Sequence, residues 1–487
     1  MSPETQAKRN GLFKSEDWWA VWLGLFIFLL GLLRLSGVDL LGWAVKTNIW
    51  LDLSKALTPV SPKGFHLSGF ASLFLTYVFL TVVLSIGIAA MGGKVGRFIG
   101  GFTIIFWLTY CCWIAGNNAF IAATPDQYAK LKIGWSLRLT GESGFIIALI
   151  VGLLIGNLWP GLTRYLQEAT RPEWYIKAAI VILGAKIGLI ALQSTGLATQ
   201  VIFRGFCAII EAYLIYWPIV YFISRKYFRF TPEWAAPLAS GISICGVSAA
   251  IATGGAIKAR PVVPIIVSSL VIIFAVVELL ILPFAAQAWL YHEPMVAGAW
   301  MGLAVKTDGA AAASGAIVDA LIRSKAATAL GVHWQESWML MAATTVKVFI
   351  DIFIAIWAFI LAVIWCWKIE CKPGERVSAA DIWHRLPKFV LGYAATFILI
   401  LLVGSGLADE GRKLLQAGIG GADNFRGIFF ALTFFSIGLV SNFRTLKEEG
   451  MGRLALVYLI CLFGFIIWIG LFISWIFFHG ITPPRIG

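Results

Sequence analysis

Long apolar stretches, separated by short polar loops, run through most of the 487-residue chain. A helix needs about 20 mostly apolar residues to cross the hydrocarbon core of a bilayer. The pattern predicts an all-α polytopic membrane protein with about thirteen transmembrane helices, and it lacks the alternating polarity typical of a transmembrane barrel. We expect the spans near residues 17–35, 68–92, 97–122, 145–159, 175–197, 201–223, 235–257, 262–289, 297–320, 340–368, 389–407, 425–445 and 452–478.

Two of these stretches are interrupted by small and polar residues, at 240–255 and at 298–315. A helix that faces lipid has no use for such residues. Non-helical backbone at membrane depth is tolerated only where it is buried in protein or lines a cavity. Interrupted spans in two places therefore predict two discontinuous helices at the binding site of a transporter.

The chain divides into two blocks. Residues 1–143 hold three spans and a polar loop, and we expect them to form an N-terminal extension in which the amphipathic segment 40–57 lies at the membrane interface. Residues 144–487 hold about ten spans, which suits an inverted repeat of two five-helix units. The internal echo between residues 185–190 and 436–440 is short.

Charge distribution bears on topology and on partners. Only 13% of the residues are charged, against roughly 25% in soluble domains, and the formal net charge is +13. If all thirteen spans cross, most loop lysines and arginines fall on one side, which predicts a cytoplasmic N-terminus. No basic run suggests a nucleic-acid partner.

The seven cysteines show neither a paired nor a zinc-type spacing, so we expect no disulfide and no metal site.

The first interrupted stretch contains Ser243, Cys245, Gly246 and Ser248. A helix break here would expose hydroxyl groups and the N–H groups of a half-helix, which attract anions. The alternative is ordinary close packing of helices through small residues.

The second interrupted stretch contains Lys306, Thr307 and Asp308. An ionisable group within a span usually faces a partner or a cavity, because burying it in lipid is costly. Lys306 and Asp308 do not share a face of a regular helix, but both could reach one cavity from an unwound segment. The alternative is a segment near the interface with Lys306 reaching toward the headgroups.

Further ionisable residues are expected inside the spans. Lys347 and Asp351 are four residues apart and could neutralise each other, or Asp351 could pair with Lys306 across the site. Arg204 and Glu211 share a helix face and could form a structural pair, and Glu278 is a candidate proton carrier or a packed core residue.

A group of segments carries a family resemblance, and these are residues 182–189, 243–252 with 257–259, 298–315, 345–347, 435–439 and 443–444. Together they resemble the sulfate exporter family of bacterial inner-membrane proteins. The resemblance implies a fold like that of the cation/proton antiporters and bile-acid symporters, in which the two discontinuous helices cross. It also implies a small-anion substrate, nominally sulfate. The chain departs from the family pattern in its N-terminal block, in having Lys306 and Thr307 where the family has a His-Glu pair, and in lacking an arginine near Ile350.

These observations predict a secondary active transporter of a small anion, with a proton or sodium as the coupling ion. A cation/proton antiporter is the alternative, and a membrane sensor or channel subunit is an alternative of another class. No motif of a metalloprotease, a phosphate-binding loop or a serine hydrolase occurs, so we expect neither an enzyme nor a cofactor. Membrane lipid surrounds the protein in this interpretation, and a homodimer remains open.

Overall fold

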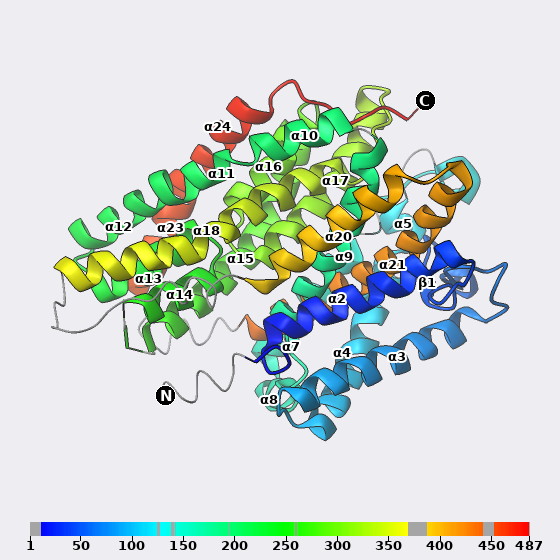
Figure 1. Ribbon diagram of the computed structural model, residues 1–487, viewed down its shortest axis with the longest axis horizontal. Helices are drawn as coiled ribbons and strands as arrows, with labels where there is room; N and C mark the ends of the chain where they lie inside the picture. The colour runs from blue at the N-terminus through cyan, green and yellow to red at the C-terminus, as the bar shows by residue number, and fades with distance from the viewer. Residues whose placement is uncertain are drawn as a thin grey trace. The chain divides into compact units, whose positions relative to one another are not determined.

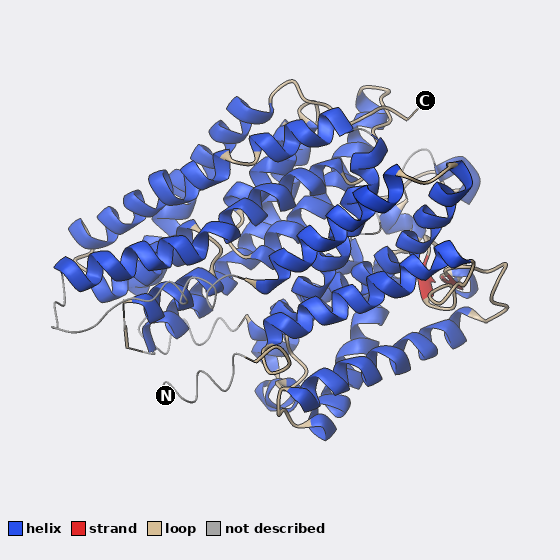
Figure 2. Ribbon diagram, in the orientation of Figure 1, coloured by secondary structure: helices blue, strands red, loops and turns tan. Residues whose placement is uncertain are grey.

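The computed structural model describes residues 11–123, 127–137, 141, 143–193, 195–257, 259–260, 262–368, 387–441 and 452–486. Helices account for most of this part of the chain, as Figure 2 shows. The all-α architecture expected for a polytopic membrane protein is therefore confirmed.

The helices fall into two compact units, which are described separately. Unit 1 comprises residues 1–198 and 388–440, and unit 2 comprises residues 199–387 and 441–487. The boundary does not coincide with the division at residue 143 expected from the sequence, because the N-terminal spans share a unit with later helices. The main helices of unit 1 are α2 (Glu16–Leu32), α3 (Gly69–Ala90), α4 (Val95–Gly116), α7 (Ser143–Leu158), α8 (Pro160–Leu166), α9 (Pro172–Gln193), α20 (Lys388–Ser405) and α21 (Asp409–Val440).

Unit 2 contains the two interrupted stretches. Helix α10 (Thr195–Arg204) leads into it across the unit boundary. Its remaining elements are α11 (Cys207–Ile209), the π-helix η4 (Ile210–Tyr216), α12 (Trp217–Lys226), α13 (Pro232–Ser243), α14 (Val247–Ala256), α15 (Val262–Trp289), α16 (Pro294–Ala304), α17 (Asp308–Ala329), α18 (Trp338–Lys368), α23 (Gly452–Cys461), the π-helix η5 (Leu462–Ile466) and α24 (Ile467–Phe478).

Nine helical segments of the described chain are long and apolar enough to cross a membrane, or ten if the bent pair α7–α8 is one span. The sequence predicted thirteen. Part of the difference comes from the stretches at 235–257 and 297–320, because each is a pair of shorter helices rather than one continuous span. Residues 425–440 of the span predicted at 425–445 belong to a longer helix, because α21 begins at Asp409, and residues 442–445 lie outside the described part of the chain.

The amphipathic segment 40–57 forms part of a small β-hairpin. It contributes strand β1 (Val45–Thr47), which pairs antiparallel with β2 (Leu57–Pro59), and the short 3-10 helix Leu53–Lys55 lies between them. The hydroxyl of Thr76 in α3 accepts a hydrogen bond from the N–H of Val45 at 3.0 Å. The hairpin is therefore tied to the helix that follows it.

Unit 1 is held together by close helix crossings at glycine. A Cβ atom on Gly152 of α7 would overlap the carbonyl oxygen of Phe435 in α21, and one on Gly438 would overlap the carbonyl oxygen of Leu149. Helix α9 packs on α20 in the same way, because a Cβ on Gly184 would overlap the carbonyl oxygen of Tyr393. These glycines let two backbones approach where any side chain would separate them.

The N-terminal helix α2 belongs to this packing. It contacts α9, α20 and α21, which run beside it in Figure 1. Gly31 of α2 faces Gly418 of α21 so closely that a Cβ on either residue would overlap the carbonyl oxygen of the other. The first span of the extension is therefore an integral part of unit 1.

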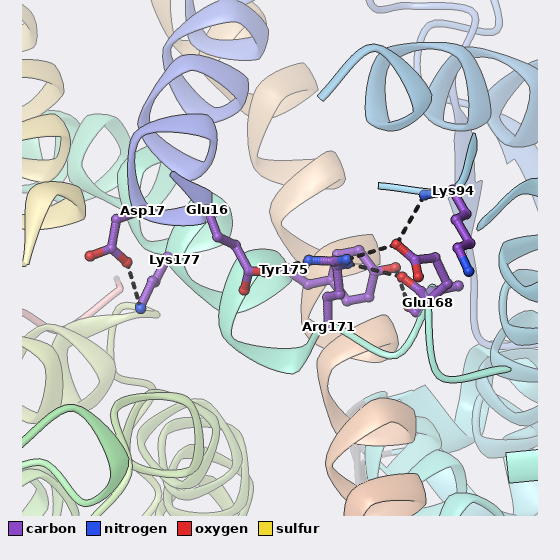
Figure 3. Close-up of polar contacts among 8 residues, drawn as sticks. Glu16, Asp17, Lys94, Glu168, Arg171, Tyr175 and Lys177 are labelled. Atoms are coloured by element: carbon purple, nitrogen blue, oxygen red, sulfur yellow. Dashed lines mark hydrogen bonds and ion pairs between the residues drawn. The ribbon is translucent and has the colours of Figure 1, made fainter. Parts of the chain in front are cut away.

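A network of ion pairs fixes one end of α2 (Figure 3). Arg171, just before α9, donates to Glu16 at 2.8 Å and to the Glu168 carboxylate at 3.2 Å. Lys177 of α9 lies 2.7 Å from Asp17, and the Glu168 carboxylate also accepts the N–H of Lys94 at 3.3 Å. The network joins α2 and the start of α4 to the α8–α9 connection.

In unit 2, one continuous helix, α15, separates the two broken ones. It packs against α13, α14 and α17, and α18 packs against α14, α16 and α17. If two five-helix units followed each other directly in the chain, four continuous spans would lie between the break in one unit and the equivalent break in the other. Here only α15 lies between the two breaks. The expected inverted repeat therefore remains a prediction.

Candidate functional site

The first break separates α13 from α14. Helix α13 ends at Ser243, and α14 starts after Gly246, whose φ of +76° is rarely adopted by residues that carry a side chain. The two halves are linked by Ser240, whose hydroxyl forms a hydrogen bond with that of Thr253 at 2.7 Å. The small residues that marked this stretch in the sequence therefore surround a real interruption of the helix.

The second break separates α16 from α17 at residues 305–307. Thr307 caps α17, because its hydroxyl accepts the N–H of Ala310 at 3.2 Å. Asp308 lies in the first turn of α17, where a negative charge is favoured by the helix dipole. The break is therefore ordered, with an extended Thr307 at its end.

The two breaks are in contact. A Cβ atom on Gly246 would lie 3.3 Å from the carbonyl oxygen of Lys306 and 3.2 Å from the methyl group of Thr307. Unit 2 thus brings two helix interruptions, distant in sequence, to one point.

The side chain of Lys347 in α18 forms hydrogen bonds to both breaks. Its buried ammonium group donates to the carbonyl oxygens of Ile244 at 2.9 Å, Lys306 at 3.0 Å and Val305 at 3.3 Å. The C-terminal carbonyl groups of a helix have no partner within it and carry negative partial charge. One lysine therefore supplies donors and positive charge to the ends of both α13 and α16.

Cys245, Asp308 and Asp351 lie together at this crossing. The ligand atoms of the three side chains lie within 4.8 Å of one another, and all three residues are buried. They come from the first break, from the start of α17 and from α18. Motif spacing in the sequence indicated no metal site, yet a thiol and two carboxylates in this arrangement are donors that could hold a cation.

Lys306 points away from this cluster. Its ammonium group donates to the carbonyl oxygen of Leu303 and lies 4.4 Å from the ring centroid of Tyr216. Its N–H donates to the carboxylate of Glu278 at 3.0 Å. The contacts of Lys306 therefore differ from the predicted cross-pair with Asp351.

Two further acids in unit 2 are buried near Lys306. Glu211 in η4 is 0% exposed and Glu278 in α15 is 1% exposed, and both interact electrostatically with Lys306. The expected pair of Arg204 with Glu211 does not form, because Arg204 donates instead to the carbonyl oxygen of Phe477. Sequence reasoning treated Glu211 as structural, although an acid in an apolar stretch was a signal for the site.

Of the residues expected at the site, Cys245, Gly246, Lys306, Thr307, Asp308, Lys347 and Asp351 lie at or beside the crossing. Ser243 ends α13, and its hydroxyl is buried without a hydrogen-bond partner among the described residues. Ser248 belongs to α14 by its backbone, but its side chain lies outside the described part of the chain.

Comparison with known proteins places the chain in a family. Residues 133–457 match the family described as conserved hypothetical protein 698. A UPF0324 membrane protein of Nitrosomonas europaea is 43% identical over 480 residues, which is 98% of each chain. Similarity to this relative therefore includes the N-terminal spans, so they are not peculiar to the present protein.

More distant relatives have the same description. A UPF0324 membrane protein of Rhodopirellula baltica is 31% identical over 81% of this chain and 65% of its own length. One from Nitratidesulfovibrio vulgaris is 29% identical over 89% of this chain and 68% of its own length. No solved structure matches significantly. The chain therefore belongs to the family of conserved hypothetical protein 698, and its relatives are UPF0324 membrane proteins.

Proposed function

We propose that this membrane protein is a secondary active transporter in which a cation, either a proton or a metal ion, binds at the crossing of α13–α14 with α16–α17. The observation that carries the proposal is the charge inventory of the crossing. Four buried carboxyl groups, those of Glu211, Glu278, Asp308 and Asp351, accompany two buried lysines, Lys306 and Lys347. If every group were ionised, the set would carry a net charge of −2.

The ammonium groups of both lysines already donate hydrogen bonds to backbone carbonyl groups. Lys347 donates to three carbonyl groups at the breaks, and Lys306 donates to Leu303. Buried negative charge is costly, and a bound proton or cation would lower the free energy of a site with four carboxyl groups and two lysines. Cys245, Asp308 and Asp351 offer the donors for a cation.

A small anion, the substrate expected from the sequence, is the second candidate as the transported solute. It is favoured by the start of α14, where Gly246 provides no side-chain cap. The N–H groups at the start of a helix attract anions. Cation coupling and anion transport are compatible, because a carrier that binds both moves them together or in exchange.

The test uses purified full-length protein in liposomes that contain a pH-sensitive dye. A proton gradient or an inward gradient of sodium, potassium, calcium or zinc is applied, first without and then with a panel of small anions, sulfate included. We expect cation-dependent flux that falls at least tenfold in Asp308→Asn and Asp351→Asn. The control is Asp52→Asn, which alters a carboxylate on an exposed loop residue.

The alternatives give different results. Flux that requires an anion and is lost in Lys306→Ala, but not in the aspartate variants, would favour anion binding without cation coupling. No flux of any solute from wild-type protein would contradict transport and favour a sensor or a channel subunit. Normal flux in Asp351→Asn would rule out the proposed cation site.

A further inference from the structure

The acids nearest Lys306 are separate from the Cys245, Asp308 and Asp351 cluster. Glu278 accepts one hydrogen bond, from the N–H of Lys306, and its other carboxylate oxygen has no partner among the described residues. Neither carboxylate oxygen of Glu211 has a hydrogen-bond partner there. Buried polar atoms normally have partners, so three such oxygen atoms in one region call for an explanation.

The polar groups that interact with Glu211 are the hydroxyl of Tyr216 and the ammonium groups of Lys306 and Lys347. The nearby hydroxyl of Tyr216 donates its proton to the carbonyl oxygen of Ile466 at 2.7 Å. It therefore offers its oxygen, not its proton, to other groups. A carboxylic acid that carries a proton can donate to such an oxygen, whereas a carboxylate cannot.

The backbone around this acid is unusual in both helices that supply it. Glu211 and Tyr216 lie in the π-helix η4, and Ile466 ends the π-helix η5. π-helical turns are rare and are found mostly at functional sites. A Cβ atom on Gly470, in the next turn after η5, would lie 2.8 Å from the Tyr216 hydroxyl and 3.3 Å from Oε1 of Glu211. The Tyr216 hydroxyl and Oε1 of Glu211 therefore both lie close to the backbone of Gly470, where a side chain would crowd them.

Lys306 connects the two acids. Its N–H contacts Glu278, its side chain reaches the ring of Tyr216, and its ammonium group interacts electrostatically with both carboxyl groups. Lys347 also faces both acids, Cys207 and Tyr216 face Glu211, and Tyr458 faces Glu278. Both lysines thus interact electrostatically with both acids.

We propose that Glu211 and Glu278 form a proton-carrying site beside the crossing, with Lys306 between them. This inference rests on the proposed transport function and adds a proton to its cycle. A proton from water binds a carboxylate oxygen on one side of the membrane and returns to water on the other. No covalent bond other than O–H forms or breaks, and no oxidant or reductant takes part.

The direct test is infrared difference spectroscopy of the full-length protein in lipid, in which the proton itself is the probe. A protonated carboxyl group gives a C=O band that shifts in D2O. We expect such a band at neutral pH in the wild type, a smaller band in Glu211→Gln and in Glu278→Gln, and loss of this component in the double variant. An identical band in the wild type and the double variant would overturn the proposal.

Glycine variants provide a second test that leaves both glutamates in place, so it does not depend on the folding of the glutamate variants. Gly470→Ala places a methyl group against Glu211 and Tyr216, so we expect it to shift the carboxyl band. Gly464→Ala is the matched control, because its methyl group would meet no atom within 4 Å. A band unmoved by Gly470→Ala would overturn the assignment to Glu211.

The spectrum separates this proposal from the transport function on which it rests. Wild-type protein that shows the band but no flux in liposomes would contradict transport and leave the proton site standing. Wild-type protein with proton-coupled flux that the double variant retains in full would overturn the proton site and leave transport standing.

Discussion

At the scale of single residues, the ammonium group of Lys347 replaces the hydrogen-bond donors that two helix breaks remove. An ammonium has three donors, and the carbonyl groups of Ile244, Val305 and Lys306 accept them. Leaving such acceptors buried without a donor costs about 1–3 kcal/mol for each group.

We therefore expect Lys347→Met to lower the free energy of unfolding by at least about 3 kcal/mol, which is about 1 kcal/mol or more for each of the three acceptors. Thermal unfolding followed by tryptophan fluorescence in detergent measures the change. Lys226→Met is the control, since Lys226 is exposed at the end of α12, and we expect it to change stability by about 0.5 kcal/mol or less. Equal stability of the two variants would contradict the role assigned to Lys347.

The same residue explains why pairing within the site was hard to predict. The spacing of Lys347 and Asp351 on one helix face suggested mutual neutralisation, and Lys306 was expected to reach Asp351. The spacing cannot reveal that two neighbouring helices end at this point and leave carbonyl groups without donors. That backbone requirement directs the ammonium of Lys347 to three carbonyl oxygens and that of Lys306 to Leu303.

At the scale of elements, the crossing of α7 with α21 depends on residues that have no side chain. The motif around Gly438 suggested an internal repeat, and the structure gives it a packing role, because the backbone of α7 occupies the space where a Cβ would lie. Overpacking at such a contact typically costs about 1–3 kcal/mol.

Gly438→Ala is therefore expected to destabilise the protein by about 1–3 kcal/mol. Gly420→Ala in the same helix is the control, because no atom lies within 4 Å of the position that its methyl group would take. A gain of up to about 1 kcal/mol in helix propensity is expected there. The melting temperatures of the two variants, measured in the same detergent, test this prediction. A Gly438→Ala variant as stable as the control would contradict the packing role of Gly438.

The observed boundaries of the helices show which features of the fold could be predicted from the sequence and which could not. Tiny and polar residues correctly placed both helix breaks, because an unwound segment requires them. The start of α21 was missed by sixteen residues, since Glu410, Arg412 and Lys413 look like a loop although they continue the helix. The π-helical segments could not be predicted, because a shift in backbone hydrogen bonding leaves the apolar pattern of a buried helix unchanged.

At the scale of the whole molecule, the N-terminal spans determine whether unit 1 is complete. The sequence suggested an appended block, but α2 packs on α9, α20 and α21 and is tied to Arg171 and Lys177 by ion pairs. Removing it would expose the faces of three helices that meet it through close contacts.

We expect a fragment of residues 144–487 to be less stable than the full chain and to be cleaved in unit 1 by limited proteolysis. Co-expression of residues 1–123 as a separate chain should restore protection, and the two fragments should purify together. If the shorter fragment resists proteolysis as well as the full chain does, α2 is dispensable for unit 1.

The contacts of Lys347 also have a mechanical consequence. A single side chain holds the ends of α13 and α16, so the two interrupted helices cannot separate without breaking its hydrogen bonds to at least one of them. We therefore expect the two interruptions to move together, as one joint. A solute held there would be carried by movement of the joint as a body, and its release would not come from the joint opening.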